Sequence, residues 1–221
     1  MYRNVDGVLA ACVEFTSPAV QELLQRDLPV VSVDYDNGSN YAVVSDNEAG
    51  VRDAVEYALQ RGHKKLAMIC GEDSQVTSLR KAAFLETLRA HQCEVQEHLL
   101  LDGKYLHPEM AYDLTKTLLH KDSRPDCILY PDDICAVSGM SAIQDAGLVP
   151  GKDMSVIGYD GHPVLRMLDP HLTTVQQDTE TLGIKAAELM LRLLHKEEIP
   201  NSERISHVSG RLLVGDTVAQ K

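Results

Sequence analysis

The chain has 221 residues, of which 44% are hydrophobic and 24% are charged, a composition typical of folded globular proteins. It carries 33 acidic and 21 basic residues, and its formal net charge of -12 argues against nucleic acid or an anionic membrane as a direct partner, because both require clustered Lys and Arg. A chain of this length forms one large domain or two smaller ones and needs no metal or disulfide to fold.

Short apolar runs alternate with helical patterns along the chain. Consecutive apolar residues predict strands over 5–11, 28–34, 41–45, 65–71, 95–101, 126–130, 155–159, 204–208 and 211–214. Apolar residues at helical spacing predict helices that begin near Ser17-Pro18 and that cover 47–61, 79–91, 108–120, 134–146 and 181–195.

The predicted strands are apolar at consecutive rather than alternating positions, which indicates a parallel sheet buried on both faces. Repeated strand–helix units then predict right-handed crossovers and a doubly wound α/β fold. Ligands bind such sheets beyond the carboxyl ends of the strands, so the segments that follow the strands are the places to search for a site.

Polar side chains follow three of the predicted strands. Arg80 can donate to vicinal hydroxyls or a carboxylate, although a solvated charge in the first turn of a helix is the simpler interpretation. One of Asp132 and Asp133 is expected to cap the next helix, which leaves the other to accept a hydrogen bond from a ligand. Asp160 precedes a glycine and is either a ligand acceptor or an ordinary turn residue.

No catalytic or nucleotide-binding motif is present. The sequence lacks G-x-G-x-x-G, G-x-x-x-x-G-K-[ST], G-x-S-x-G and H-E-x-x-H. Asp132 and Asp133 are adjacent, so their side chains diverge on a helix and make a poor acid–base pair. We therefore expect no enzyme, no cofactor and no metal.

The five cysteines form no C-x-x-C pair, and Cys12, Cys70 and Cys127 lie in apolar runs. This is typical of buried thiols in a reducing compartment rather than of disulfides. The N-terminus does not resemble a signal peptide, and no run approaches the ~18 apolar residues of a membrane span. We expect a cytoplasmic protein with no membrane partner, or one whose leader has been removed.

A series of segments matches, in order, the pattern of one protein family. They are VDGVL, LPVVSVD, VVSDNEAG with VEYALQRGHKKLAMI, RKAAF, PDDICAVSGMSAIQDAGL, DMSVIGYDG and LTTVQQD. Ala83 stands where that pattern has glycine, and Asp132 stands where it has asparagine. With these two departures, the chain resembles the effector-binding domain of LacI/GalR-type bacterial transcription regulators over nearly its whole length.

The resemblance implies a two-lobed fold like that of periplasmic sugar-binding proteins, with parallel sheets flanked by helices. The N-terminal lobe would contain residues 1–62 and 179–203, and the C-terminal lobe residues 63–178 and 204–221. The chain would cross between the lobes near Gly62-His63, near Gln177-Asp178-Thr179 and near residue 200. The DNA-binding head and the first strand–helix units of the N-terminal lobe are expected to be missing, so that this lobe is incomplete and the chain is a truncated or shortened regulator.

The resemblance also implies a ligand site between the lobes. Arg80 and Asp160 match residues that bind sugar hydroxyls or purine-type effectors, and Tyr105 matches an aromatic residue that stacks on the ligand. The further ligand contacts that it implies are Asp132, Gln177, Asp46 and Val76. The expected effector is a small polar metabolite, in the first place a sugar.

The resemblance implies a homodimer that binds operator DNA only through a helix-turn-helix head, which is expected to be missing here. Three alternatives stay open. The chain could be a solute-binding protein of a sugar transporter, a doubly wound enzyme, or a fragment whose incomplete site binds nothing.

Overall fold

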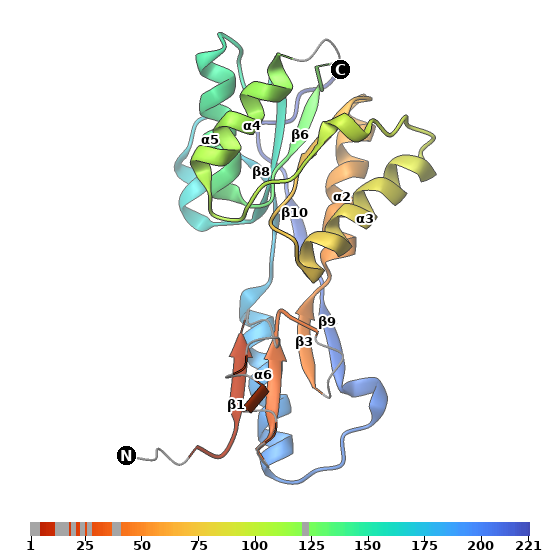
Figure 1. The fold of residues 1–221 in the computed structure, drawn as a ribbon, viewed down its shortest axis with the longest axis vertical. Coiled ribbons are helices and arrows are strands. Elements are labelled where there is room, and N and C mark those ends of the chain that lie inside the picture. Colours follow the sequence, from red (N-terminus) through yellow and green to blue (C-terminus); the bar gives the residue numbers. More distant parts are fainter. Residues whose placement is uncertain are drawn as a thin grey trace. The chain divides into compact units, whose positions relative to one another are not determined.

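The computed structural model describes residues 5–11, 18, 21–22, 25, 28–36, 41–120 and 124–221. It divides the chain into two compact units. The first unit contains Met1–Asp46 and Asp178–Ser209, and the second contains Asn47–Gln177 and Gly210–Lys221. Figure 1 labels the elements of both units, which are described one at a time below.

The first unit contains a parallel sheet with the strand order β1-β2-β3-β9. Its elements are β1 (Val8–Ala11), β2 (Val30–Val33), β3 (Ala42–Ser45), β9 (Ile205–Val208), α6 (Thr179–Leu194) and the 3-10 helix η3 (Asn201–Glu203). The buried stripe of α6, with Leu182, Ala186 and Leu189, packs with Val31 and Val43 of the sheet. The predicted helix near Ser17-Pro18 falls largely outside the described residues, as does Cys12.

The second unit contains a six-stranded sheet with the order β10-β8-β7-β6-β4-β5, parallel except for β10. Its strands are β4 (Leu66–Ile69), β5 (Leu100–Leu101), β6 (Cys127–Leu129), β7 (Ser155–Asp160), β8 (Thr173–Gln176) and β10 (Arg211–Leu213). Its helices are α2 (Asn47–Gln60), α3 (Gln75–Ala90), α4 (Pro108–Leu119), α5 (Asp133–Asp145) and the 3-10 helices η1 (Glu97–Leu99) and η2 (Pro163–Met167).

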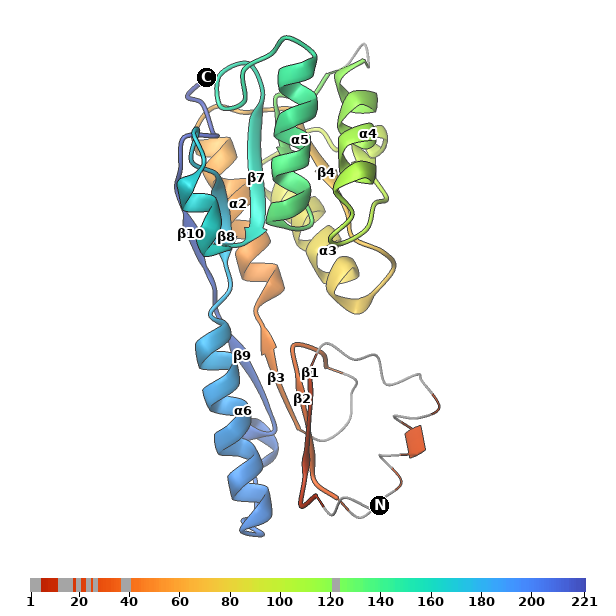
Figure 2. The same cartoon turned by 90° about the vertical axis from the view of Figure 1, so that its left-hand side faces the viewer.

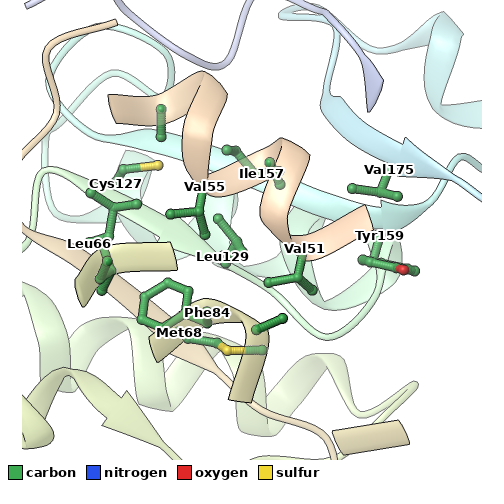
Figure 3. Close-up of a cluster of buried hydrophobic side chains, with 14 of the residues drawn as sticks. Val51, Val55, Leu66, Met68, Phe84, Cys127, Leu129, Ile157, Tyr159 and Val175 are labelled. Atoms are coloured by element: carbon green, nitrogen blue, oxygen red, sulfur yellow. The ribbon is translucent and has the colours of Figure 1, made fainter. Parts of the chain in front are cut away.

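Both faces of this sheet are covered, which confirms the interpretation of the consecutive apolar runs. One face packs against α2 and α3, where Val55, Phe84 and Leu129 belong to one buried cluster (Figure 3). The other face packs against α4 and α5 through a second cluster that includes Ile128 and Ile143. Figure 2 shows α2 and α5 on opposite sides of β7.

The unit boundaries correct the predicted lobes in two places. Helix α2 was expected in the N-terminal lobe, but its buried residues belong to the core of the second unit. Strand β9 was expected in the C-terminal lobe, but it pairs with β3 of the first unit. The boundaries predicted at residues 62 and 203 are therefore wrong, and the chain passes between units at residues 46/47, 177/178 and 209/210.

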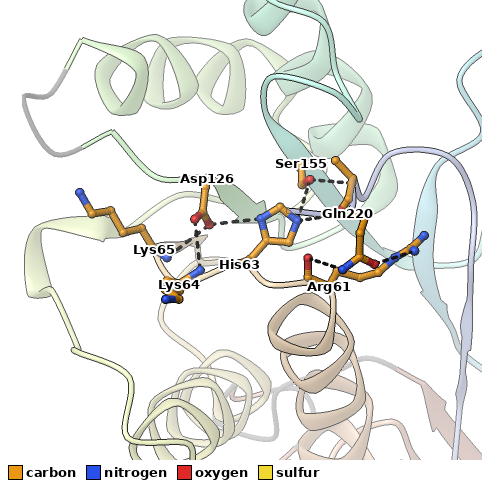
Figure 4. A network of polar contacts seen from close by, with 8 residues as sticks. Arg61, His63, Lys64, Lys65, Asp126, Ser155 and Gln220 are labelled. Carbon is orange, nitrogen blue, oxygen red and sulfur yellow. Dashed lines mark hydrogen bonds and ion pairs between the residues drawn. The ribbon is translucent and has the colours of Figure 1, made fainter.

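A polar network ties the C-terminal segment to the amino end of this sheet (Figure 4). The His63 Nδ1 atom lies 3.3 Å from Asp126 Oδ1, and Nε2 lies 3.1 Å from both Ser155 Oγ and the carbonyl oxygen of Ala219. The Ser155 Oγ atom also accepts a hydrogen bond from the backbone N–H of Ala219. We call these four residues the His63 clasp.

Candidate functional site

Three polar segments meet at the carboxyl edge of the sheet in the second unit. Strands β4, β6 and β7 are parallel and consecutive in the sheet, so the segments that follow them lie along the same edge. These segments lead into α3, α5 and η2 respectively. Open parallel sheets bind ligands at this edge, and the side chains gathered there define the candidate site.

Arg80 lies in the second turn of α3 rather than in the first, because the helix begins at Gln75. Ser74 caps the helix, since its Oγ atom accepts a hydrogen bond from the backbone N–H of Thr77 at 3.2 Å. The Arg80 residue is only 5% exposed. The interpretation of Arg80 as a solvated helix charge is therefore wrong.

The Arg80 guanidinium is held by three groups of the second unit. Its Nε–H donates to Asn47 Oδ1 at 2.8 Å, and Nη1 donates to the carbonyl oxygen of Pro131 at 2.9 Å. Its Cζ atom lies 3.5 Å from the centroid of the Tyr159 ring, where the aromatic face replaces part of the lost hydration. These two hydrogen bonds use two of the five N–H donors of a guanidinium.

Asp160 is the last residue of β7 and follows Tyr159 directly. Its φ is +105°, a value that costs a non-glycine residue ~1–3 kcal/mol. Gly161 follows with a φ of +71°, and a Cβ atom there would lie 2.6 Å from the Cα atom of Gln176. The Asp160 Oδ1 atom accepts a hydrogen bond from Gln177 Nε2 at 2.6 Å. Such strain, held in place by neighbours, is typical of functional sites.

Asp160 as a whole residue is exposed to solvent. The atoms around its carboxyl nevertheless restrict the hydration of that group. This loss of hydration raises the pKa of Asp160 to about 6, although the Gln177 amide and the Arg80 guanidinium act to lower it. The negative charges of Asp133 and Asp132 add to the rise. The carboxyl of Asp160 therefore changes its charge close to neutral pH.

Tyr105 lies beside the Arg80 guanidinium, with 5.7 Å between the ring centroid and Cζ. Its hydroxyl oxygen lies 3.0 Å from Thr77 Oγ1. Burial raises the pKa of Tyr105, against the opposing effects of Arg80 and Thr77. Gly71 makes room for the ring, because a Cβ atom at this position would lie 2.1 Å from a ring carbon of Tyr105.

These contacts form one group of side chains. We call Asn47, Arg80, Tyr105, Tyr159 and Asp160 the Arg80 cluster. It combines a stacked guanidinium, two aromatic rings and a carboxylate, which is a set suited to a small polar ligand with hydroxyl groups.

A family model described as "Periplasmic binding protein-like domain" matches residues 55–218. The chain belongs to this family. Two curated relatives are the HTH-type transcriptional repressors PurR of Haemophilus influenzae (strain PittEE), 31% identical over 200 residues, and of Histophilus somni (strain 129Pt), 30% identical over 199 residues. These matches cover 89% and 88% of this chain but only 59% and 60% of the relatives, so the chain spans about three-fifths of their length.

Solved structures of LacI-type regulators have the same fold. A LacI-family regulatory protein from Chloroflexus aggregans is 29% identical, with a TM-score of 0.89 over 99% of this chain and 78% of that chain. The regulator CelR in complex with cellobiose is 25% identical, with a TM-score of 0.88 over 96% of this chain and 66% of that chain. The chain thus matches the C-terminal effector-binding domain of LacI-type regulators, and the curated relatives named above are repressors rather than transporter subunits.

The LacI-type domain brings together four of the residues that the sequence singled out. Arg80 lies beside Tyr105, and Asp160 is bonded to Gln177. Val76 is half-buried in the first turn of α3, and its side chain is apolar. Asp46 belongs to the first unit, where its backbone N–H donates to the carbonyl of Val208.

Asp132, rather than Asp133, caps α5. Its Oδ1 atom accepts from the backbone N–H of Cys135 at 2.8 Å, and its Oδ2 atom accepts from the backbone N–H of Leu106 at 2.7 Å. Asp132 is 2% exposed and Asp133 is 1% exposed. Internal donors bind both carboxylates, so ligand contact by Asp132 stays a prediction without support from its hydrogen bonds.

Sequence reasoning did not identify Asn47 and Tyr159 as parts of the site. Both lie in segments that match the family pattern, since Asn47 belongs to VVSDNEAG and Tyr159 directly precedes Asp160 in DMSVIGYDG. Their role depends on contacts with Arg80, which is distant from both in sequence. Pattern alone does not show such contacts.

Other chemistry has little support among the described residues. They contain no group of three or more His, Cys, Asp or Glu side chains arranged to bind a metal, and no helix long and apolar enough to cross a membrane. Cys70 and Cys127 are buried free thiols, as expected. The His63 clasp has the order of a Ser–His–Asp triad, but Ser155 and His63 are each 1% exposed, so a substrate has no access to them.

Proposed function

We propose that the chain is the sensing domain of a LacI-type transcriptional regulator and that its effector, a small uncharged polyhydroxy compound such as a sugar, binds at the Arg80 cluster. One observation carries this proposal. A buried guanidinium stacked on Tyr159 stands beside the strained, ionisable Asp160 at the ligand-binding edge of a parallel sheet. A carboxylate accepts hydrogen bonds from hydroxyls, and a guanidinium donates to them.

The charge around the site favours a neutral effector over an anion. The carboxyls of Asp132 and Asp133 act on Asp160 electrostatically together with the guanidinium of Arg80, and the whole chain carries a net charge of -12. A phosphate or carboxylate ligand would have to overcome this field. The relative CelR, solved as a complex with cellobiose, supports a sugar.

The effector would act by shifting the population of conformations of an intact regulator. We infer a cytoplasmic homodimer, since a two-fold dimer matches a palindromic operator, and DNA contact through a helix-turn-helix head rather than through this acidic domain. The lac repressor, whose dimer is solved on operator DNA, shares the fold at 24% identity. We further infer that the domain catalyses no reaction.

Titration calorimetry with a panel of mono- and disaccharides and nucleobases tests the proposal. We expect one compound class to bind, with Asp160→Asn weakening its affinity at least about tenfold, which corresponds to the ~1.4 kcal/mol of one charge-assisted hydrogen bond. The matched control is Asp113→Asn, which changes an exposed aspartate on α4 and should bind as the unmodified chain does.

Arg80→Lys tests the guanidinium as the second proposed ligand contact. The lysine keeps the positive charge but loses the planar group that stacks on Tyr159 and that can donate two parallel hydrogen bonds. We expect weaker binding, and far-UV circular dichroism would confirm that the variant is folded. Absence of any ligand, or equal affinity in the unmodified chain and in both variants, would contradict the proposal.

A further inference from the structure

Asp133 is a buried carboxylate to which the proposed function assigns no contact with the effector. It is 1% exposed, and the structure shows no ion pair to it among the described residues. Burial raises the pKa of Asp133, with the Thr174 hydroxyl and two backbone N–H groups opposing the rise. A buried acid is costly, and the helix cap at Asp132 does not require a second one.

The hydrogen bonds of Asp133 join the turn that carries Asp160 to strand β8. Its Oδ2 atom accepts from the backbone N–H of His162 at 2.7 Å, and the backbone N–H of Gly161 also contributes. Its Oδ1 atom accepts from Thr174 Oγ1 at 2.5 Å. The carboxylate therefore joins α5 and β8 to the residues immediately after Asp160.

The chain makes room for this carboxylate in β7. A Cβ atom at Gly158 would lie 2.4 Å from Asp133 Oδ1. Only a glycine at this strand position allows the carboxylate to approach the backbone so closely. Gly158 therefore allows the Asp133 carboxylate to lie against the backbone of β7, where it accepts hydrogen bonds from the turn.

The turn needs such support because its backbone is strained. Asp160 and Gly161 both have positive φ angles, and only the glycine adopts that conformation at no steric cost. Gln177 holds the turn on one side, through its Nε2–H to Asp160 Oδ1. Asp133 holds the following two peptide groups on the other side.

We propose that Asp133 is a positioning residue for the effector site: it fixes the 160–162 turn, and with it the orientation of Asp160. The inference rests on the proposed function only in that Asp160 contacts the effector. Its consequences for the turn can be measured without any ligand. A failure of ligand binding and a failure of this inference are therefore distinguishable.

The test is carbon-13 NMR of the aspartate carboxyls over pH 4 to 8, with the Asp160 signal assigned from Asp160→Asn. In the unmodified chain we expect Asp160 to titrate near pH 6 and the His162 amide proton to lie downfield, as for an amide bonded to a carboxylate. In Asp133→Asn we expect the Asp160 midpoint to fall and the His162 proton to move upfield. A folded Asp133→Asn with both signals unchanged would overturn the inference.

Variants of Thr174 keep the test decisive if Asp133→Asn does not fold. Thr174→Val removes one donor to the carboxylate and should shift the His162 amide, whereas Thr174→Ser keeps the hydroxyl and should restore it. The matched control is Thr115→Val, since Thr115 is equally buried but bonds to Ala111 and Tyr130. Thr115→Val should lower stability without moving either signal, and the same behaviour in Thr174→Val would reduce Asp133 to a packing role.

Discussion

At the scale of single residues, the most informative is Asp160, whose pKa is raised to about 6 by restricted hydration. The folded state then binds a proton more tightly than the unfolded state, whose carboxyl titrates near 3.8. Stability from this group is therefore full below pH 3.8 and is lost as the pH rises through 6. We predict that Asp160→Asn raises the melting temperature relative to the unmodified chain more at pH 8 than at pH 4.5. A pH-independent difference would contradict this prediction.

Gly161 has to be glycine for two reasons: its φ is positive, and its Cα lies too close to the backbone of Gln176 for a side chain to fit. A Cβ atom at Gly161 would lie 2.6 Å from the Cα atom of Gln176, whereas at Gly147, with a φ of +76°, it would meet nothing within 4 Å. We predict that Gly147→Ala lowers the free energy of unfolding by ~1 kcal/mol from φ alone and that Gly161→Ala lowers it by ~3 kcal/mol. Urea unfolding of both variants checks the difference, and equal losses would show that the clash is relieved.

Sequence alone identified the residues with the strongest chemistry but not their surroundings. The positions of Arg80 and Asp160 after two strands also allow a solvated charge and an ordinary turn residue, and it is the family resemblance that predicts both as ligand residues; the structure shows them at one edge of the sheet. The burial of Arg80 was not predictable, because it results from the Tyr159 ring and from the oxygens of Asn47 and Pro131, all distant in sequence.

At the scale of elements, most helices and strands lie within a few residues of their predicted bounds. The exceptions have local causes. The strand predicted over 95–101 is largely the 3-10 helix η1, and only Leu100–Leu101 form a strand. Strand β8 is not among the predicted strands, although its residues belong to the matched segment LTTVQQD. Helix α3 starts four residues before its predicted start, because the Ser74 cap precedes a first turn in which Val76 is the only apolar residue and gives no helical spacing.

The assignment of α2 to the second unit could not be derived from its pattern. The apolar stripe with Val51 and Val55 shows which face of the helix is buried, but not against which sheet. Its partner Phe84 comes from α3, and Gly50 approaches the hydroxyl of Tyr159 closely. These are tertiary contacts, and the helical spacing of apolar residues in the sequence does not reveal them.

The His63 clasp yields a prediction at this scale, because it joins the C-terminal segment to β6 and β7. Partial burial raises the pKa of Asp126. The His63 ring and the backbone N–H groups of Lys64 and Lys65 lower the pKa by more than burial raises it, so the net shift is downward. Stability from Asp126 is therefore present above pH 3.8 and is lost as the pH falls through its folded pKa.

We predict that Asp126→Asn lowers the free energy of unfolding by about 1–2 kcal/mol at pH 7 and by less at pH 3. Urea unfolding at the two pH values measures both. Asp216→Asn is the matched control, since Asp216 pairs with His171 at 2.8 Å on the exposed surface and should matter less. A loss at pH 3 equal to that at pH 7 would contradict the role assigned to the ionised carboxylate.

At the scale of the whole molecule, the chain is a two-unit α/β protein of the periplasmic-binding-protein-like family, and the second unit carries the Arg80 cluster. A second observation that supports the proposed sensing role is that Arg80 and Asp160 are each bonded to a residue at a unit boundary. Asn47 is the first residue after one crossing, and Gln177 is the last residue before another. An effector that forms hydrogen bonds with the guanidinium or the carboxylate would therefore compete with the bonds to Asn47 and Gln177, the residues at two of the chain crossings.

The most direct test of this account is an amide and arginine side-chain NMR map of the chain, recorded with the tightest ligand from the calorimetric panel. We predict that the largest shift changes fall on the Arg80 Nε–H and on the backbone N–H groups of Asp160 and Gly161, and that Asp160→Asn needs a ligand concentration at least about tenfold higher to reach half of its shift change. Changes confined to residues remote from the Arg80 cluster, with these three signals unmoved at saturation, would contradict the central claim.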